Sequence, residues 1–189
     1  MSKAISTIAA LSAIFVCAGS TAALSDIAAV PIDDLNFPSC FDDTGKPIPY
    51  VTRDYYNSVA PDSPHIIYYA GALFLRDDPP SQPVILYNTS FIETLSPAER
   101  AFVFSHECYH QESGDAKEAY LALQGGDLSK DYIRAIESAA DCAAAKRMRD
   151  EFQASLEDMI SIQPMLRKVT AGKNKQPRID AIMACFSAP

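Results

Sequence analysis

The sequence predicts an α+β fold that is mainly helical, with a small sheet on its N-terminal side. Two long helical segments give the strongest signal, and both follow a serine that can cap a helix. Two short runs rich in aromatic and β-branched residues, 65–75 and 83–88, precede them and predict strands. A chain of 189 residues is long enough to bury a substantial core in one domain.

The first 23 residues have the pattern of an export signal. Lys3 supplies a positive start, an apolar run follows, and small residues up to Ala23 suit cleavage. The apolar run is too short for a stable membrane span. We therefore expect an exported protein, periplasmic or secreted, whose mature part, residues 24–189, forms a single domain.

Turn residues and capping residues predict where each element begins and ends. Residues 24–64 are rich in Pro, Asp and Asn, which favours loop with short extended pieces. A capping box at residues 96–99, with Pro97 at the first helical position, predicts a helix that ends at Gly114.

Three interruptions are expected in the rest of the chain. The segment that contains residues 124–127, Gln-Gly-Gly-Asp, is expected to be a turn or loop. A second long helix should run from about Ser129 to Phe152. A further break is expected near Pro164, and residues 172–177 should form a loop before a last helix over residues 178–186.

The charge balance excludes one class of partner. The chain carries a formal net charge of −8 and no basic patch with interleaved aromatic residues, which argues against nucleic-acid binding. One local group of basic residues is expected to be a solvated face. It consists of Arg167, Lys168, Lys173, Lys175 and Arg178.

The motif His106-Glu107-x-x-His110 carries the chemistry. Residues four apart lie about 40° apart on a helix, so the two imidazoles point the same way and can bind one ion. Neutral imidazoles suit zinc. Glu107 lies about 100° round the helix, where its carboxylate can take a proton from a water at the metal without being a ligand.

A catalytic zinc needs a third protein ligand, which the second long helix can supply. Only His65 remains among the histidines, so a carboxylate is expected. Glu137 and Asp141 lie one turn apart in an alanine-rich stretch, where buried acids need partners. Glu137 is the candidate third ligand, and Asp141 the candidate acceptor for the N–H of a ligand histidine.

These motifs resemble a known family. H-E-x-x-H followed by E-x-x-x-D on a later helix is similar to the gluzincin class of zinc metallopeptidases. The segments His106-Glu-Cys and Ala140-Asp-Cys, with Arg178 and then Cys185 near the end, resemble small exported bacterial metallopeptidase-like proteins. The resemblance implies a zincin-like helix pair with zinc held by His106, His110 and Glu137. It also implies Glu107 as general base and Asp141 as orienting partner.

The sequence departs from these proteins around the second histidine. Tyr109, Gln111 and Glu112 stand in the region where many members carry another histidine. A group that polarises the substrate cannot be singled out, and four residues stay open for that role. They are His65, Tyr109, Tyr120 and Tyr132.

Four cysteines remain once residues 1–23, and Cys17 with them, are removed. In an exported chain they predict up to two disulfides, with three pairings open. Cys108 lies about 200° from His106 on the helix, away from the metal, which favours a structural bridge. The paired motifs around Cys108 and Cys142 favour a bond between these two, leaving Cys40 with Cys185.

Two functions follow as expectations. The first is hydrolysis of peptide bonds in a peptide or protein substrate, with the strand near residues 83–87 pairing with the extended substrate. The second is a zinc-stabilised binding or structural module with little or no turnover.

Overall fold

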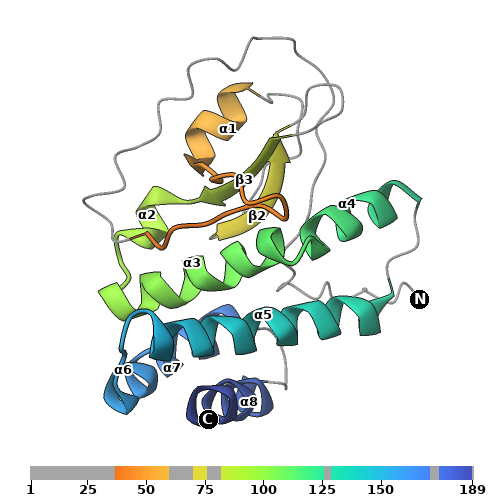
Figure 1. Ribbon diagram of the computed structural model, residues 1–189. Coiled ribbons are helices and arrows are strands. Elements are labelled where there is room, and N and C mark those ends of the chain that lie inside the picture. The colour runs from red at the N-terminus through yellow and green to blue at the C-terminus, as the bar shows by residue number, and fades with distance from the viewer. Residues whose placement is uncertain (1–36, 60–69, 76–81, 126–128, 171–174, 189) are drawn as a thin grey trace, which may run out of the picture.

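The structure is a computed structural model that describes residues 37–59, 70–75, 82–125, 129–170 and 175–188 (Figure 1). The expected export signal and His65 lie outside these ranges. The described part is mainly helical with a small sheet on its N-terminal side, so the predicted α+β class is confirmed.

The sheet has three strands in the order β1-β3-β2. They are β1 (Tyr50–Thr52), β2 (Ala70–Leu75) and β3 (Gln82–Tyr87). The central strand β3 runs parallel to β1, with Tyr50 opposite Ile85, and antiparallel to β2, with Ala72 opposite Ile85. Both predicted strands are confirmed. Residues 83–87 were expected to pair with an extended substrate, but β3 has a neighbouring strand on each side and so has no free edge for such pairing.

Two short helices lie in the N-terminal half of the chain, one before strand β2 and one after strand β3. They are α1 (Arg53–Val59) and α2 (Thr89–Ile92). The expectation of loop over residues 24–64 is wrong at α1. The Thr52 hydroxyl accepts a hydrogen bond from the backbone N–H of Tyr55 at 3.1 Å, and Asp54 lies in the first turn. Both features favour the start of a helix, although the Pro and Asp residues of this region predict loop.

The first long helix, α3 (Pro97–Glu112), begins at the predicted capping box. Ser96 Oγ accepts from the Glu99 N–H at 3.2 Å, and Glu99 Oε2 accepts from the Ser96 N–H at 2.8 Å. The helix ends before Gly114, which has φ +76°, a conformation that glycine adopts without steric cost.

Two helices follow, α4 (Asp115–Gly125) and α5 (Lys130–Asp150). The expected loop at Gln124 and Gly125 is wrong, because α4 continues through both. Ser129 caps α5 as predicted, with its Oγ accepting from the Tyr132 N–H at 3.1 Å.

The chain ends with α6 (Leu156–Ser161), α7 (Gln163–Val169) and α8 (Lys175–Ser187). The break expected near Pro164 is confirmed, because α6 ends and α7 begins around Ile162. Pro164 itself stands in the first turn of α7, where its missing N–H leaves no hydrogen bond unmade. The last helix begins at Lys175, three residues before the predicted start, so residues 175–177 are helical and not loop.

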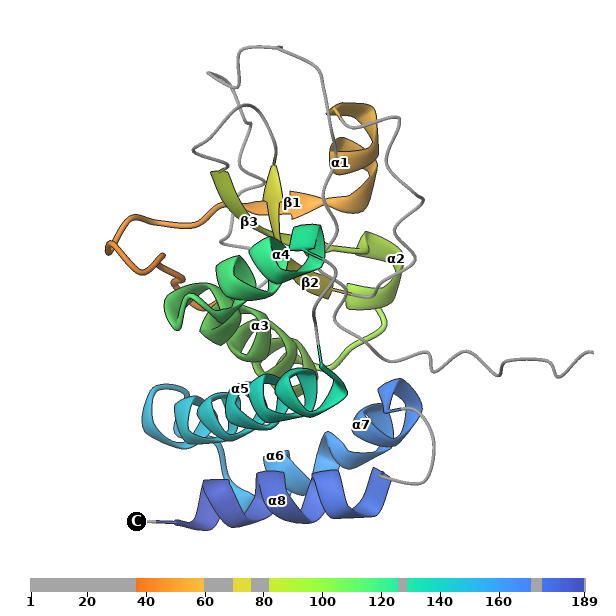
Figure 2. The same ribbon diagram turned by 90° about the vertical axis from the view of Figure 1, so that its right-hand side faces the viewer.

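The elements stack in layers (Figures 1 and 2). The sheet lies on α3, α5 crosses beneath α3, and α8 packs against the far side of α5. An aromatic cluster joins the N-terminal segment to α3: the ring centroid of Phe37 lies 4.2 Å from that of Phe104 and 4.6 Å from that of Tyr50. Ala140, Ala144 and Ala145 are buried in α5, and their small side chains permit its close approach to both neighbours.

Two disulfides hold these layers together, with bonds Cys40–Cys108 and Cys142–Cys185. The expected pairing of Cys108 with Cys142 is therefore wrong. The faces of α3 and α5 that meet carry the histidines and acids. Cys108 meets the N-terminal segment and Cys142 meets α8. Among the described helices, none has the length and apolar character needed to cross a membrane.

Candidate metal centre

His106 and His110 lie side by side on the buried face of α3. Their Nε2 atoms are 3.2 Å apart, and the two rings meet nearly at right angles, with an interplanar angle of 81°. Their side chains are only 7% and 4% exposed. The predicted i, i+4 arrangement thus brings two imidazole nitrogens to one point inside the molecule.

Glu137 of α5 completes a triangle with them. Its Oε2 lies 3.5 Å from His106 Nε2, and its Oε1 lies 3.7 Å from His110 Nε2. All three donor atoms lie within 4.8 Å of one another. Ligand atoms about 2.0–2.1 Å from one tetrahedral zinc are separated by about 3.4 Å, so the spacing fits a single ion. The three residues could hold a metal ion.

Asp141 lies behind His106. Its Oδ1 is 3.0 Å from His106 Nδ1, the ring nitrogen on the side away from Glu137. The two atoms do not form an aligned hydrogen bond, so the contact is primarily electrostatic. The carboxylate favours a proton on Nδ1, which leaves the lone pair on Nε2 free for an ion.

Asp115 does the same for His110, a relationship that the sequence reasoning missed. Its Oδ1 is 2.8 Å from His110 Nδ1. Asp115 is the first residue of α4, and the turn at Gly114 brings it back alongside the last turn of α3. The signal was present in the sequence as a helix-ending glycine followed directly by an acid.

The carboxylates around the two imidazoles favour positive charge at this site. Burial lowers the pKa of His106, but Asp141 and Glu137 outweigh burial and raise that pKa to about 10. Burial would raise the pKa of Asp141, yet His106 and Arg178 lower it to about 2. Acids that retain a proton on a buried imidazole also favour a divalent cation in its place.

Glu107 points from α3 toward the sheet. Its Oε2 accepts a hydrogen bond from the backbone N–H of Ala72 in β2 at 3.0 Å, and the residue is 6% exposed. Burial is the largest influence on the Glu107 carboxyl and raises its pKa. A buried carboxyl with a raised pKa beside two imidazoles is suited to accepting a proton.

Two of the departures from the resembled proteins, Gln111 and Glu112, have structural partners. The Gln111 side-chain amide donates to Leu73 O at 2.9 Å and to Val84 O at 3.1 Å, which ties α3 to both β2 and β3. Glu112 Oε1 lies 3.4 Å from Arg147 Nη1 of α5. These residues fix the helix that carries the histidines.

Arg178 is not on a solvated face, which corrects that part of the expectation for the basic residues. Its Nε donates to Asp141 Oδ2 at 2.6 Å, and its Nη2 donates to Asp141 Oδ1 at 2.7 Å. Arg167 and Lys168 of α7 are exposed as expected. Lys173 lies outside the described residues.

A second group of possible ligand atoms does not qualify as a metal site. Cys40, Cys108 and Glu112 lie close enough together to share an ion. The two sulfur atoms are bonded to each other, however, and a disulfide lacks the thiolate that binds zinc.

Of the four residues expected as candidates to polarise a substrate, the structure describes the side chains of Tyr109 and Tyr132. The Tyr132 hydroxyl donates to Glu118 Oε2 at 2.9 Å, so it is engaged near the surface. Tyr109 is partly buried on α3. His65 and the side chain of Tyr120 lie outside the described part.

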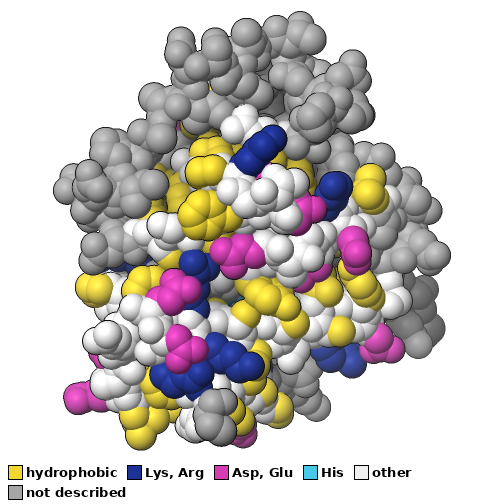
Figure 3. All heavy atoms as spheres, viewed as in Figure 1, with side chains coloured by type: hydrophobic (Ala, Val, Ile, Leu, Met, Phe, Trp, Pro, Cys, Tyr) yellow, Lys and Arg dark blue, Asp and Glu magenta, His cyan; other side chains and the backbone are white. Residues whose placement is uncertain are grey.

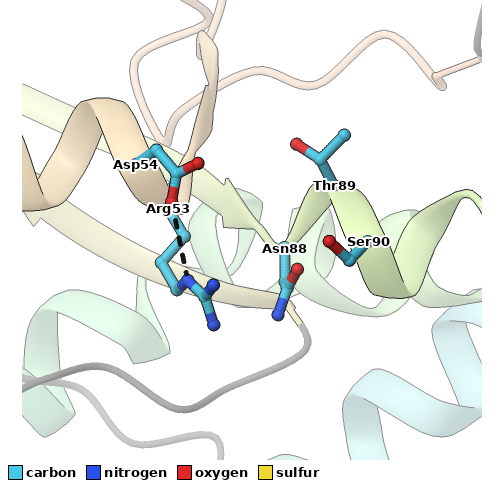
Figure 4. Close-up of a pocket in the computed structure, with 5 residues that line it drawn as sticks. All are labelled: Arg53, Asp54, Asn88, Thr89 and Ser90. Atoms are coloured by element: carbon cyan, nitrogen blue, oxygen red, sulfur yellow. Dashed lines mark ion pairs between the residues drawn. The ribbon is translucent and has the colours of Figure 1, made fainter.

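One small cavity lies elsewhere, where α1 meets α2 (Figure 4). Its lining is polar and includes the Arg53–Asp54 ion pair at 3.9 Å. A volume of about 30 Å³ accommodates one or two water molecules and no substrate. On the face shown in Figure 3, acidic and basic side chains of the described residues are interspersed.

No family model, curated protein or solved structure matches this chain. The gluzincin resemblance of the motifs therefore stays an expectation, and the case for a function rests on the geometry of the site.

Proposed function

We propose that the protein is a zinc-dependent hydrolase of peptide bonds, with His106, His110 and Glu137 as the ligands. The observation that supports this best is the convergence of three donor atoms, two of them on imidazoles whose other ring nitrogens face carboxylates. Two imidazoles and one carboxylate are a donor set typical of catalytic zinc. When bound, zinc would polarise the substrate carbonyl and make a water more acidic.

Glu107 is the proposed general base. Its hydrogen bond to Ala72 N–H fixes one carboxylate oxygen against β2, which orients the group beside the two histidines. Burial raises its pKa and strengthens it as a proton acceptor. In this role the carboxylate takes a proton from the attacking water and later delivers it to the leaving amine.

Strand β2 replaces residues 83–87 as the proposed docking strand for the substrate. In the described part of the sheet, β2 has a neighbour on one side only, whereas β3 is flanked on both. An extended peptide can add to such an edge through backbone hydrogen bonds. The contact between Ala72 and Glu107 places this edge strand beside the proposed base.

The burial of Glu107 also supports a second candidate, a zinc-stabilised module without turnover. A carboxylate that is 6% exposed and bonded to a strand can serve to hold α3 to the sheet. The two candidates differ in what Glu107 does, and this residue therefore decides between them.

The test is the substitution Glu107→Gln, which keeps the side-chain shape and an oxygen that can accept from Ala72. We expect purified mature protein to contain about one zinc per chain, and the variant to retain it. Hydrolysis of a peptide library should fall by about 10²–10⁴-fold, because the general base is lost. Glu99→Gln at the start of the same helix is the control and should retain activity.

Two results would contradict the proposal. Absence of zinc from wild-type protein purified without chelators would remove the metal site itself. Zinc at full occupancy with no cleavage by wild type, and unchanged stability and metal content in Glu107→Gln, would favour the module without turnover.

A further inference from the structure

We infer that Arg178 of α8 is a positioning residue for the metal site, acting on His106 through Asp141. This inference rests on the metal binding proposed above, and it does not depend on peptidase activity. It extends the site beyond the two helices that carry the motifs to the last helix of the chain.

The guanidinium group of Arg178 contacts Asp141 in a two-point arrangement. Nε lies 2.6 Å from Oδ2 and Nη2 lies 2.7 Å from Oδ1. Two parallel charge-assisted hydrogen bonds fix the plane of a carboxylate, which a single bond does not. The orientation of Asp141 is therefore set from α8.

The oriented carboxylate then meets the ligand histidine. Asp141 Oδ1, the oxygen that accepts from Arg178 Nη2, is the atom 3.0 Å from His106 Nδ1. A change in the carboxylate plane moves this oxygen relative to the imidazole ring. The direction of the His106 Nε2 lone pair toward the ion depends on that contact.

Arg178 is itself held in place. Its third nitrogen, Nη1, lies 3.2 Å from the hydroxyl of buried Thr170, at the end of α7. The Cys142–Cys185 disulfide joins α5 and α8 next to this contact, since Cys142 directly follows Asp141. Cys185 lies seven residues after Arg178, which is two turns along the same side of α8. Figure 2 shows α8 along the side of α5 opposite to α3.

Burial makes the contact specific. The side chains of Asp141 and Arg178 are 7% and 23% exposed, so water cannot readily replace either partner. A surface pair would tolerate exchange of Arg for Lys, but at a buried two-point contact lysine supplies a charge without the planar fork.

The experiment uses Arg178→Lys, which retains the charge and removes the fork. Its matched control is Arg167→Lys on the exposed side of α7. Zn²⁺ affinity is measured by competition with a chromophoric chelator, and the Co²⁺-substituted protein gives an absorption spectrum that reports ligand geometry. We expect Arg178→Lys to bind Zn²⁺ roughly tenfold more weakly and to alter the Co²⁺ spectrum, while Arg167→Lys matches wild type.

A double-mutant cycle separates positioning from a general loss of stability. If Arg178 acts through Asp141, Arg178→Lys should have almost no further effect in an Asp141→Asn background. An equal loss of Zn²⁺ affinity in both backgrounds would overturn the inference, as would a single variant whose affinity and Co²⁺ spectrum equal those of wild type.

A milder variant tests the same inference if Arg178→Lys does not fold. Thr170→Val keeps Arg178 and removes only its third anchor, and it should weaken Zn²⁺ binding about two- to threefold. If Arg178→Lys does not fold, unchanged affinity in Thr170→Val overturns the inference. Zinc binding without peptide cleavage would remove only the peptidase proposal. A wild-type chain that binds neither Zn²⁺ nor Co²⁺ would remove both.

Discussion

The two histidines of the candidate site are supported in different ways. His110 contacts Asp115, five residues away across a single tight turn. His106 contacts Asp141, thirty-five residues away on α5, and Asp141 is held in turn by Arg178 of α8. Local chain geometry supports one imidazole, whereas the packing of three helices supports the other. The His106 half of the site should therefore be more sensitive to changes elsewhere in the molecule.

Glu137 connects the two halves, and its removal should have the largest effect. The substitution Glu137→Ala deletes the donor that lies 3.5 Å from one imidazole nitrogen and 3.7 Å from the other. We expect purified protein to lose its zinc, because two histidines alone form an incomplete site. Metal analysis checks this, with the exposed Glu157→Ala as control; full zinc occupancy in Glu137→Ala would show that Glu137 is not a ligand.

The comparison itself is tested by replacing the two orienting acids one at a time. Asp141→Asn should weaken Zn²⁺ binding by about 10–100-fold, and Asp115→Asn should lie at the low end of that range. The difference arises because Asp141→Asn also leaves the buried Arg178 without its carboxylate. The loss of stability expected for one broken buried pair is about 3–5 kcal/mol.

Competition titrations and chemical denaturation of the metal-free variants measure both quantities. Equal losses of affinity and stability in Asp141→Asn and Asp115→Asn would mean that the two halves are supported equally. A larger loss of affinity and stability in Asp115→Asn than in Asp141→Asn would mean that His110 depends more on its orienting acid than His106 does.

The stability of the metal-free protein should depend on pH through His106 and Asp141. Asp141 has a folded-state pKa of about 2, below its unfolded value, so its contribution is present above about pH 4 and is lost as pH falls toward 2. That contribution is about 2 kcal/mol. His106 has a folded-state pKa of about 10, above its unfolded value, so its contribution is present below about pH 6.5 and is lost as pH rises toward 10.

Denaturation in the presence of chelator should thus give greatest stability between about pH 4 and 6.5. Added Zn²⁺ should stabilise the protein more at alkaline than at acidic pH, because the ion displaces the proton on the imidazole. A flat profile across this range in metal-free wild type would contradict the charge pattern derived for His106 and Asp141.

Much of the site was predictable because it depends on helical periodicity. The capping box at Ser96 set the start of α3, and a spacing of four residues placed His106 beside His110. The same spacing brought Glu137 and Asp141 to one face of α5. Chemistry then selected Glu137, since a site with two imidazoles needs a third donor and the sequence has few histidines.

The errors arose where a local pattern competes with packing. Residues 24–64 contain loop-forming Pro and Asp, yet Thr52 caps a helix there. The disulfides could not be paired from motif similarity, because which cysteines meet depends on which helices face each other. The basic residues near Arg178 in the sequence predict a solvent-exposed position for it, and only the position of α8 brings it to Asp141.

The sequence by itself determined the mainly helical class, the two helices of the site and the side chains that face one another along each helix. These features depend on short-range geometry, in which a helix repeats every 3.6 residues whatever surrounds it. The tertiary structure decided the disulfide pairing, the edge position of β2 and the link from Arg178 through Asp141 to His106. Those features depend on how helices and strands pack, and segments distant in sequence meet only when burial of the whole core brings them together.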